Sequence, residues 1–136
     1  MKKTIMIIGA GFGQIPAILK SKKLGFKVIA IDKNKHAEGM KLCDLAYDID
    51  VLDYKKAIQI AQKHKIDGVM TMQSDIAVPT VGKINDYFNF RGPNYKTSVL
   101  CSNKIENRKL FKSYRIPQPK FKVAKSVSEI LEALKY

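Results

Sequence analysis

Short apolar runs alternate along the chain with segments in which apolar residues recur at helical spacing. The runs are typical of buried strands, and the segments are typical of amphipathic helices. The runs predict strands at 4–9, 27–32, 45–50 and 67–72, with a possible fifth at 89–92. The helical segments are 14–25, 53–65, 77–88, a stretch near 94–101, 103–114 and 126–136. Gly25 is expected to end the first helix, and Asp53 and Ser126 are expected to cap theirs.

Strands that alternate with helices predict a parallel sheet, because each right-handed crossover returns the chain to the same edge. We therefore expect an α/β fold: a Rossmann-like parallel sheet of four to five strands with helices on both faces and the strand order 3-2-1-4. After residue 92 the apolar runs give way to basic helical segments. Residues 1–92 are thus predicted to form a Rossmann-like domain, and residues 93–136 a basic, helical C-terminal extension.

Ligands of such sheets bind where the strands end, near the point at which the strand order reverses. That edge is predicted to gather three groups of residues from loops that follow three strands. The candidate site residues are Gly11, Phe12, Gly13, Asp32, Gln73, Ser74 and Asp75.

The loop from Gly9 to Gly13 has three interpretations. It joins a strand to a helix, and Asp32 ends the next strand, where a ribose-binding acid belongs in a dinucleotide-binding domain. Against that interpretation, the third glycine of G-x-G-x-x-G would fall at Gln14, and Pro16 removes an N–H from the first helical turn. The other two interpretations are a tight turn that needs positive φ and a loop that faces a different substrate.

Composition and charge exclude some classes of protein. The formal net charge is +13, and residues 87–136 carry 11 basic and 3 acidic residues. Only three of the 25 basic residues are arginines, whereas nucleic-acid surfaces usually rely on arginine, so no nucleic-acid partner is expected. The basic third instead suits a smaller anion such as a nucleotide polyphosphate.

The remaining polar chemistry is sparse. Cys43 and Cys101 do not have metal-ligand spacing, and neither do His36 and His64, so no metal site and no catalytic residue are expected within this chain. No apolar run approaches the roughly 20 residues of a membrane helix, and the apolar run after Met1 is too short for a signal peptide. A cytoplasmic protein without a membrane partner is therefore expected.

Taken together, an ordered set of segments resembles the N-terminal domain of ATP-grasp ligases, a family that includes biotin carboxylase and the large chain of carbamoyl-phosphate synthase. The segments are GAGFGQ, KKLGFKVIAID, CDLAYDID, DGVMTMQSD, NKIENRKLFKSYRIPQPKF and KSVSEILEAL. The fifth resembles the family's lysine-containing helix followed by Gly-Ile-Pro-x-Pro, except that Arg115 stands where glycine is usual.

The resemblance implies ATP-dependent ligation through an acyl phosphate, with a small carboxylate or amine as substrate. It implies that Lys104 contacts nucleotide phosphates and that the glycine loop faces the substrate rather than ATP. The family's phosphate-covering loop and Mg²⁺-binding acids lie beyond Tyr136. The chain is therefore expected to be either a piece of a longer ligase or a stand-alone domain that lost or never had the activity. We favour a truncated piece, inactive alone, that binds neither ATP nor Mg²⁺ tightly, although both serve the full-length protein. Exposed apolar surface would make it self-associate, as a homodimer.

Two alternatives of other classes remain open at this stage. One is a stand-alone NAD(P)-binding module, for which Asp32 would be the diagnostic residue. The other is a basic adaptor for nucleic acid, whose affinity would fall steeply with salt.

Overall fold

The structure is a computed structural model that describes residues 2–135. Contacts divide the chain into two compact units, Met1–Ser102 and Asn103–Tyr136. The first unit therefore extends past residue 92 to include the helix α4 (Tyr95–Ser102), which packs against α3 (Val78–Phe88). The functional division expected at residue 92 stays a prediction.

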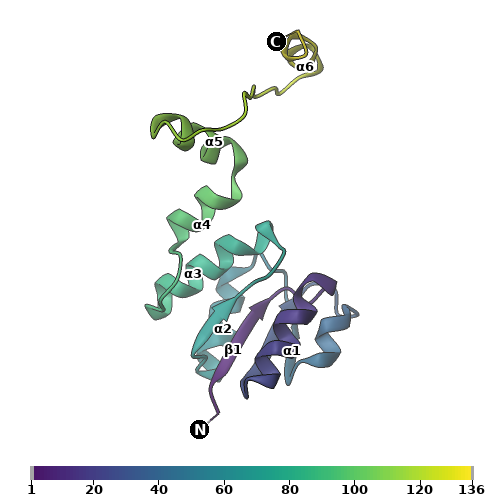
Figure 1. The fold of residues 1–136 in the computed structure, drawn as a ribbon. Coiled ribbons are helices and arrows are strands. Elements are labelled where there is room, and N and C mark those ends of the chain that lie inside the picture. The colour runs from purple at the N-terminus through teal and green to yellow at the C-terminus, as the bar shows by residue number, and fades with distance from the viewer. Residues whose placement is uncertain (1, 136) are drawn as a thin grey trace. The chain divides into compact units, whose positions relative to one another are not determined.

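A four-stranded parallel sheet organises the first unit (Figure 1). The strands are β1 (Thr4–Ile8), β2 (Lys27–Asp32), β3 (Leu45–Asp48) and β4 (Gly68–Met70). Their order is β3-β2-β1-β4, which confirms the predicted α/β fold and strand order.

The possible fifth strand at 89–92 is wrong. Asn89 has φ 53° and ends α3 in the left-handed conformation, and the Phe90 N–H bonds back to the Asn85 carbonyl at 3.0 Å. Residues 90–94 form bends and irregular backbone. Phe90 packs on the core beside Phe88, so its apolar side chain serves packing and not a strand.

Helices cover both faces of the sheet, as predicted (Figure 1). Alternate side chains of β1 explain this arrangement: Met6 and Ile8 join a core with α2 (Tyr54–His64) and α3, whereas Ile7 joins a core with α1 (Ile15–Lys23). Both sides of the central strands are therefore apolar, which accounts for their continuous hydrophobic runs. The loops add three short helical turns: η1 (Phe12–Gln14), η2 (Glu38–Leu42) and η3 (Asp75–Ala77).

The predicted helix caps are present. Gly25 has φ +87° just after α1, and the Asp53 side chain accepts the Lys56 N–H at 3.1 Å at the start of α2. Ser126 accepts the Glu129 N–H at 3.2 Å, although the Glu129 carboxylate returns to the Lys125 N–H rather than to Ser126. Among residues 2–135, no helix has the length and apolar character that crossing a membrane requires.

The second unit holds two helices, α5 (Lys104–Ser113) and α6 (Val127–Ala133), joined by an extended segment. Asn103 caps α5 by accepting the N–H groups of Ile105 and Glu106. The expected apolar stripe of α6 is exposed within this chain: Ile130, Leu131 and Leu134 show 50%, 58% and 77% of their surface.

Arg115 occupies a backbone position that favours glycine. Its φ is 54°, its N–H bonds to the Lys112 carbonyl, and the Ile116 N–H bonds to the Phe111 carbonyl, which together form a Schellman end to α5. We expect Arg115→Gly to stabilise this helix end by about 0.5–1 kcal/mol, because glycine adopts positive φ without steric cost. Amide exchange at Ile116 should slow correspondingly, whereas Arg108→Gly within α5 should accelerate it. Faster exchange in Arg115→Gly would contradict this explanation.

Candidate functional site

The predicted site residues of the first unit lie at the carboxyl ends of β1, β2 and β4. Asp32 is the last residue of β2, and the others lie on the segments that follow β1 and β4. Gly9 leaves β1 with φ +94°, and its N–H reaches the Ile31 carbonyl of β2 at 2.8 Å. This turn requires a glycine, because a side chain strains the backbone at such φ. The loop then runs through Gly11 into η1 and directly into α1.

Asp32 binds the protein's own backbone. Its Oδ2 accepts the Ala10 N–H at 2.8 Å, and its Oδ1 accepts the Asn34 N–H at 2.8 Å. The carboxylate thus ties the glycine loop to the turn after β2. This geometry assigns Asp32 a positioning role, and contact with a substrate stays a prediction.

Gln14 fills the position where a dinucleotide-binding loop carries its third glycine. The side chain is buried, its Oε1 accepts the Gly11 N–H at 2.9 Å, and its Nε2 donates to the Met72 carbonyl. One loop N–H that could face a phosphate is therefore already bonded within the protein. In the sequence Gln14 stands out only as a departure from the dinucleotide motif, and the pattern does not reveal that its side chain is buried and bonded to two loops.

The loop after β4 meets the glycine loop. The Thr71 hydroxyl donates to the Ile8 carbonyl at 2.7 Å, and a Cβ added to Gly13 would lie 3.0 Å from Oε1 of Gln73. Gln73 itself has φ 53°. The structure thus brings Gly13 and Gln73 together, as predicted.

The rim of this site combines exposed polar and apolar groups. Gln73 and Asp75 are exposed, Ser74 is half-buried at the start of η3, and Phe12 shows 75% of its surface. A hollow of about 300 Å³ lies beside the end of β4, lined by residues that include Thr71, Asn85 and Arg91. Arg91 is the cation of this hollow and was not among the predicted site residues, because the sequence pattern placed it in a possible strand at 89–92.

Gly39, in η2, packs against the glycine loop. It is buried, its N–H donates to the Ala10 carbonyl at 2.8 Å, and an added Cβ would lie 2.5 Å from that same carbonyl oxygen. The backbone of η2 therefore packs directly on the loop. No local pattern around Gly39 indicated this contact.

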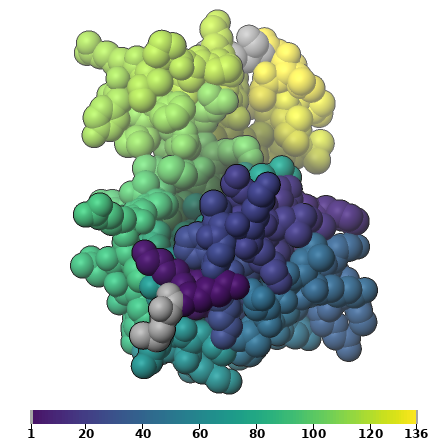
Figure 2. Space-filling view, turned by 60° about the horizontal axis from the view of Figure 1, so that its bottom comes forward, coloured from purple at the N-terminus to yellow at the C-terminus, as the bar shows by residue number. Residues whose placement is uncertain are grey.

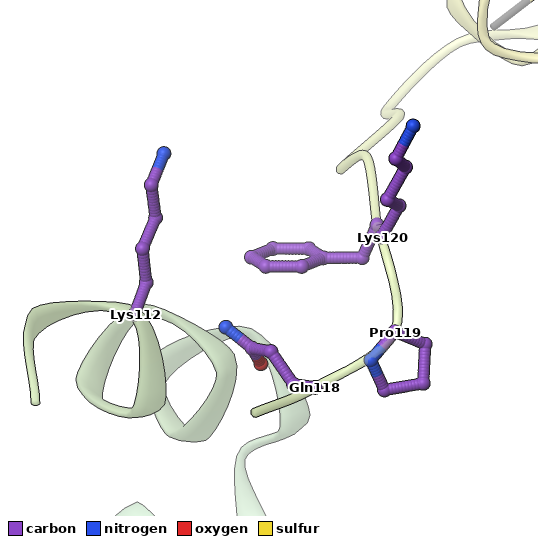
Figure 3. A pocket seen from close by; sticks show the side chains of 5 residues that line it. Lys112, Gln118, Pro119 and Lys120 are labelled. Atoms are coloured by element: carbon purple, nitrogen blue, oxygen red, sulfur yellow. The ribbon is translucent and has the colours of Figure 1, made fainter. Parts of the chain in front are cut away.

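Lys104, the predicted nucleotide ligand, is the first residue of α5 in the second unit. The same unit has a hollow of about 270 Å³, lined by Lys112, Gln118, Pro119, Lys120 and Phe121 (Figure 3). Gln118 faces Lys112 from the extended segment and is anchored to Arg108, whose carbonyl accepts the Gln118 Nε2 at 3.1 Å. The phosphate role of Lys104 stays a prediction.

The described residues support neither nucleophilic chemistry at Cys43 nor the binding of a metal ion. Burial raises the pKa of Cys43 to about 11, so its thiol is protonated at neutral pH and is a poor nucleophile. Among residues 2–135, no three or more His, Cys, Asp or Glu side chains come together in an arrangement suited to a metal ion.

Enzymes of known activity are similar in sequence to this chain. No family model matches the chain. A formate-dependent phosphoribosylglycinamide formyltransferase from Ignicoccus hospitalis is 23% identical over 94% of the chain and 32% of the relative. The corresponding enzyme from Hydrogenovibrio crunogenus is 30% identical over 78% of the chain and 27% of the relative.

Solved structures of similar enzymes have the same fold as this chain. Phosphoribosylglycinamide synthetase from Anaerococcus prevotii superposes with a TM-score of 0.78 at 26% identity, over 99% of this chain and 35% of that one. The chain is related to the amino-terminal part of ATP-grasp ligases. The biotin carboxylase domain of 2-oxoglutarate carboxylase from Hydrogenobacter thermophilus, solved with MgADP and bicarbonate, shares the fold, with a TM-score of 0.71 at 20% identity over 99% of this chain and 33% of that one.

The resemblance inferred from the sequence motifs is thereby confirmed. The chain spans about a third of the length of the curated relatives it matches. It corresponds to their amino-terminal portion, which is the part that carries the Rossmann-like sheet.

Proposed function

We propose that this chain acts as the amino-terminal, substrate-side domain of an ATP-dependent carboxylate ligase. The observation that carries the proposal is the match of nearly the whole chain to the first third of ATP-grasp enzymes, in sequence and in fold. Such an enzyme would phosphorylate a carboxylate with ATP, and a nucleophile such as an amine would then displace the phosphate.

The loops at the carboxyl ends of the strands would hold the small carboxylate or amine substrate. Gly11 and Gly13 let the glycine loop pack closely on Gln14 and Gln73, and Gln73, Ser74 and Asp75 offer polar groups beside them. Phe12 would cover the ligand with an apolar ring, and Arg91 would attract a carboxylate or phosphate from the adjoining hollow. Asp32 and Gln14 would hold these loops in place through their backbone hydrogen bonds.

ATP and Mg²⁺ would bind elsewhere in the assembled enzyme. The described residues do not fit a Mg²⁺ site, since residues 2–135 hold no cluster of metal ligands. In the assembled enzyme, Mg²⁺ would therefore be coordinated by a segment equivalent to the remaining two-thirds of the relatives. From this chain only Lys104 would contribute, as a point charge toward nucleotide phosphates.

The two alternative functions are less well supported by the site. Dinucleotide binding needs free loop N–H groups and an acid turned to a ribose, whereas Gln14 occupies the Gly11 N–H and Asp32 binds two backbone N–H groups. No observation favours a nucleic-acid adaptor. Self-association as a homodimer and a cytoplasmic location belong to the proposal as well.

The substrate role can be tested by NMR titration of the whole chain. We expect glycinamide ribonucleotide, a substrate type suggested by the relatives' names, to shift the amide signals of Gly11, Gly13 and Ser74. Ser74→Ala together with Gln73→Ala should weaken that binding at least tenfold, whereas Gln59→Ala, an exposed change on α2, should not. NADH that shifts the same loop amides more strongly, with loss of binding in Asp32→Ala, would overturn the proposal in favour of dinucleotide binding.

A further inference from the structure

Two adjoining hollows lie at the amino-terminal edge of the sheet, at the opposite ends of the strands from the glycine loop. One measures about 360 Å³ and is lined by Lys2, Lys3, Thr4, His64, Lys65 and Asp67. The other measures about 280 Å³ and is lined by Lys3, Thr4, Ile5, Phe26, Asp67 and Gly68. They share Lys3, Thr4 and Asp67, so they form one continuous surface with a basic part and an apolar part.

The basic part is held on rigid backbone. The Thr4 N–H donates to Asp67 Oδ2 at 2.7 Å, and the Asp67 N–H donates to the Thr4 carbonyl at 2.7 Å, which locks the start of β1 to the segment before β4. The Lys3 carbonyl accepts the Lys27 N–H at 2.8 Å, so the chain just before β1 is bonded to β2. Figure 2 shows this start of the chain, in purple, at the surface of the first unit.

The cations here are only partly neutralised. Within the described part of the chain, Lys3 and Lys65 form no ion pair with a carboxylate, whereas Lys2 lies close enough to Asp44 for their charges to interact. Asp67 is the acid that lines the basic hollow, and one of its oxygens already accepts the Thr4 N–H.

The environment of His64 is consistent with an excess of positive charge. Its Nε2 lies 2.5 Å from the Tyr47 hydroxyl of β3, and its pKa is lowered by burial and by the charges of Lys27 and Lys63. Lys65 ends α2 with φ 48°, a conformation that glycine or asparagine favours.

We propose that this edge is a second binding site, for a phosphate-bearing small molecule with an apolar or aromatic portion, of the nucleoside monophosphate type. The phosphate would lie among Lys2, Lys3 and Lys65, and the flat portion would lie against Phe26 and Ile5 beside Gly68. Gly68 leaves open space, since nothing lies within 4 Å of an added Cβ. This site is separate from the loops assigned to the substrate and does not depend on that assignment.

The two histidines allow the two ends of the sheet to be told apart in one experiment. His64 lines the basic hollow, whereas exposed His36 follows β2 at the carboxyl end, beyond Asn34. The whole chain would be titrated with AMP, with inorganic phosphate and with adenosine, while the ring-proton NMR signals of both histidines are followed. We expect AMP to shift His64 and not His36, phosphate to do so at least tenfold more weakly, and adenosine to be weaker still. AMP should also raise the pKa of His64.

Charge-matched variants complete the test. Lys3→Gln with Lys65→Asn should weaken AMP binding at least tenfold, because both positively charged side chains line the basic hollow; asparagine tolerates the φ of residue 65. Lys33→Gln with Lys35→Gln removes the same charge from exposed positions after β2 and should leave the affinity unchanged. Circular dichroism would confirm that both variants fold. An AMP shift confined to His36, no shift at either histidine, or equal losses in both variants would overturn the proposal.

Discussion

Gly39→Ala is expected to destabilise the first unit by about 3 kcal/mol. The added methyl group would lie 2.5 Å from the Ala10 carbonyl oxygen and 2.8 Å from Cδ1 of Ile18. The Ile18 methyl can rotate away, but the carbonyl belongs to the glycine loop, which Asp32 holds at the Ala10 N–H and Gln14 holds at the Gly11 N–H. The strain must therefore move either η2 or the loop itself. Urea unfolding followed by circular dichroism would measure the loss.

Gly68→Ala is the matched control for this prediction. Nothing lies within 4 Å of a Cβ at Gly68, which is in β4, so the same change in side chain meets open space there. We expect a change within about 0.5 kcal/mol. Similar free energies of unfolding for the two variants would show that η2 yields easily and that Gly39 does not fix the loop.

The sheet could be predicted from the sequence because its signals are local and repeated. Each apolar run is bounded by polar residues or glycine, and each intervening helix has an apolar stripe, so the parallel topology follows from alternation alone. The error at 89–92 has the same origin. Phe90 suggested a strand, but the left-handed Asn89 had already turned the chain, and asparagine accepts that conformation without a recognisable motif.

The candidate site could be predicted only in part. Its location followed from the rule that ligands gather at the carboxyl ends of parallel strands. The roles of individual side chains did not follow, because they depend on contacts between distant segments. Gln14 bonds to Met72, Asp32 to Ala10, and Gly39 to Ala10, and no periodicity links these positions.

The hydrogen bonds of Asp32 argue against a ribose-binding role for its carboxylate. A carboxylate at the end of the second strand is the usual sign of a ribose ligand, and the sequence alone allowed that interpretation. In the structure the same carboxylate satisfies two backbone N–H groups of neighbouring turns. Asp32 and Gln14 therefore bond two consecutive N–H groups of the loop, those of Ala10 and Gly11, and the loop conformation is fixed before any ligand arrives.

Gln14→Leu is expected to destabilise the first unit by about 2 kcal/mol, because leucine keeps the volume but leaves the Gly11 N–H and the Met72 carbonyl without their protein partner. Both groups belong to half-buried residues, so water compensates only partly. Thermal and urea unfolding would measure the loss, with exposed Gln59→Leu as the control. Amide exchange at Gly11 should accelerate in Gln14→Leu alone. Unchanged exchange at Gly11 would mean that Asp32 suffices to hold the loop, and the glycine loop would then be a stable turn without the bridge to β4.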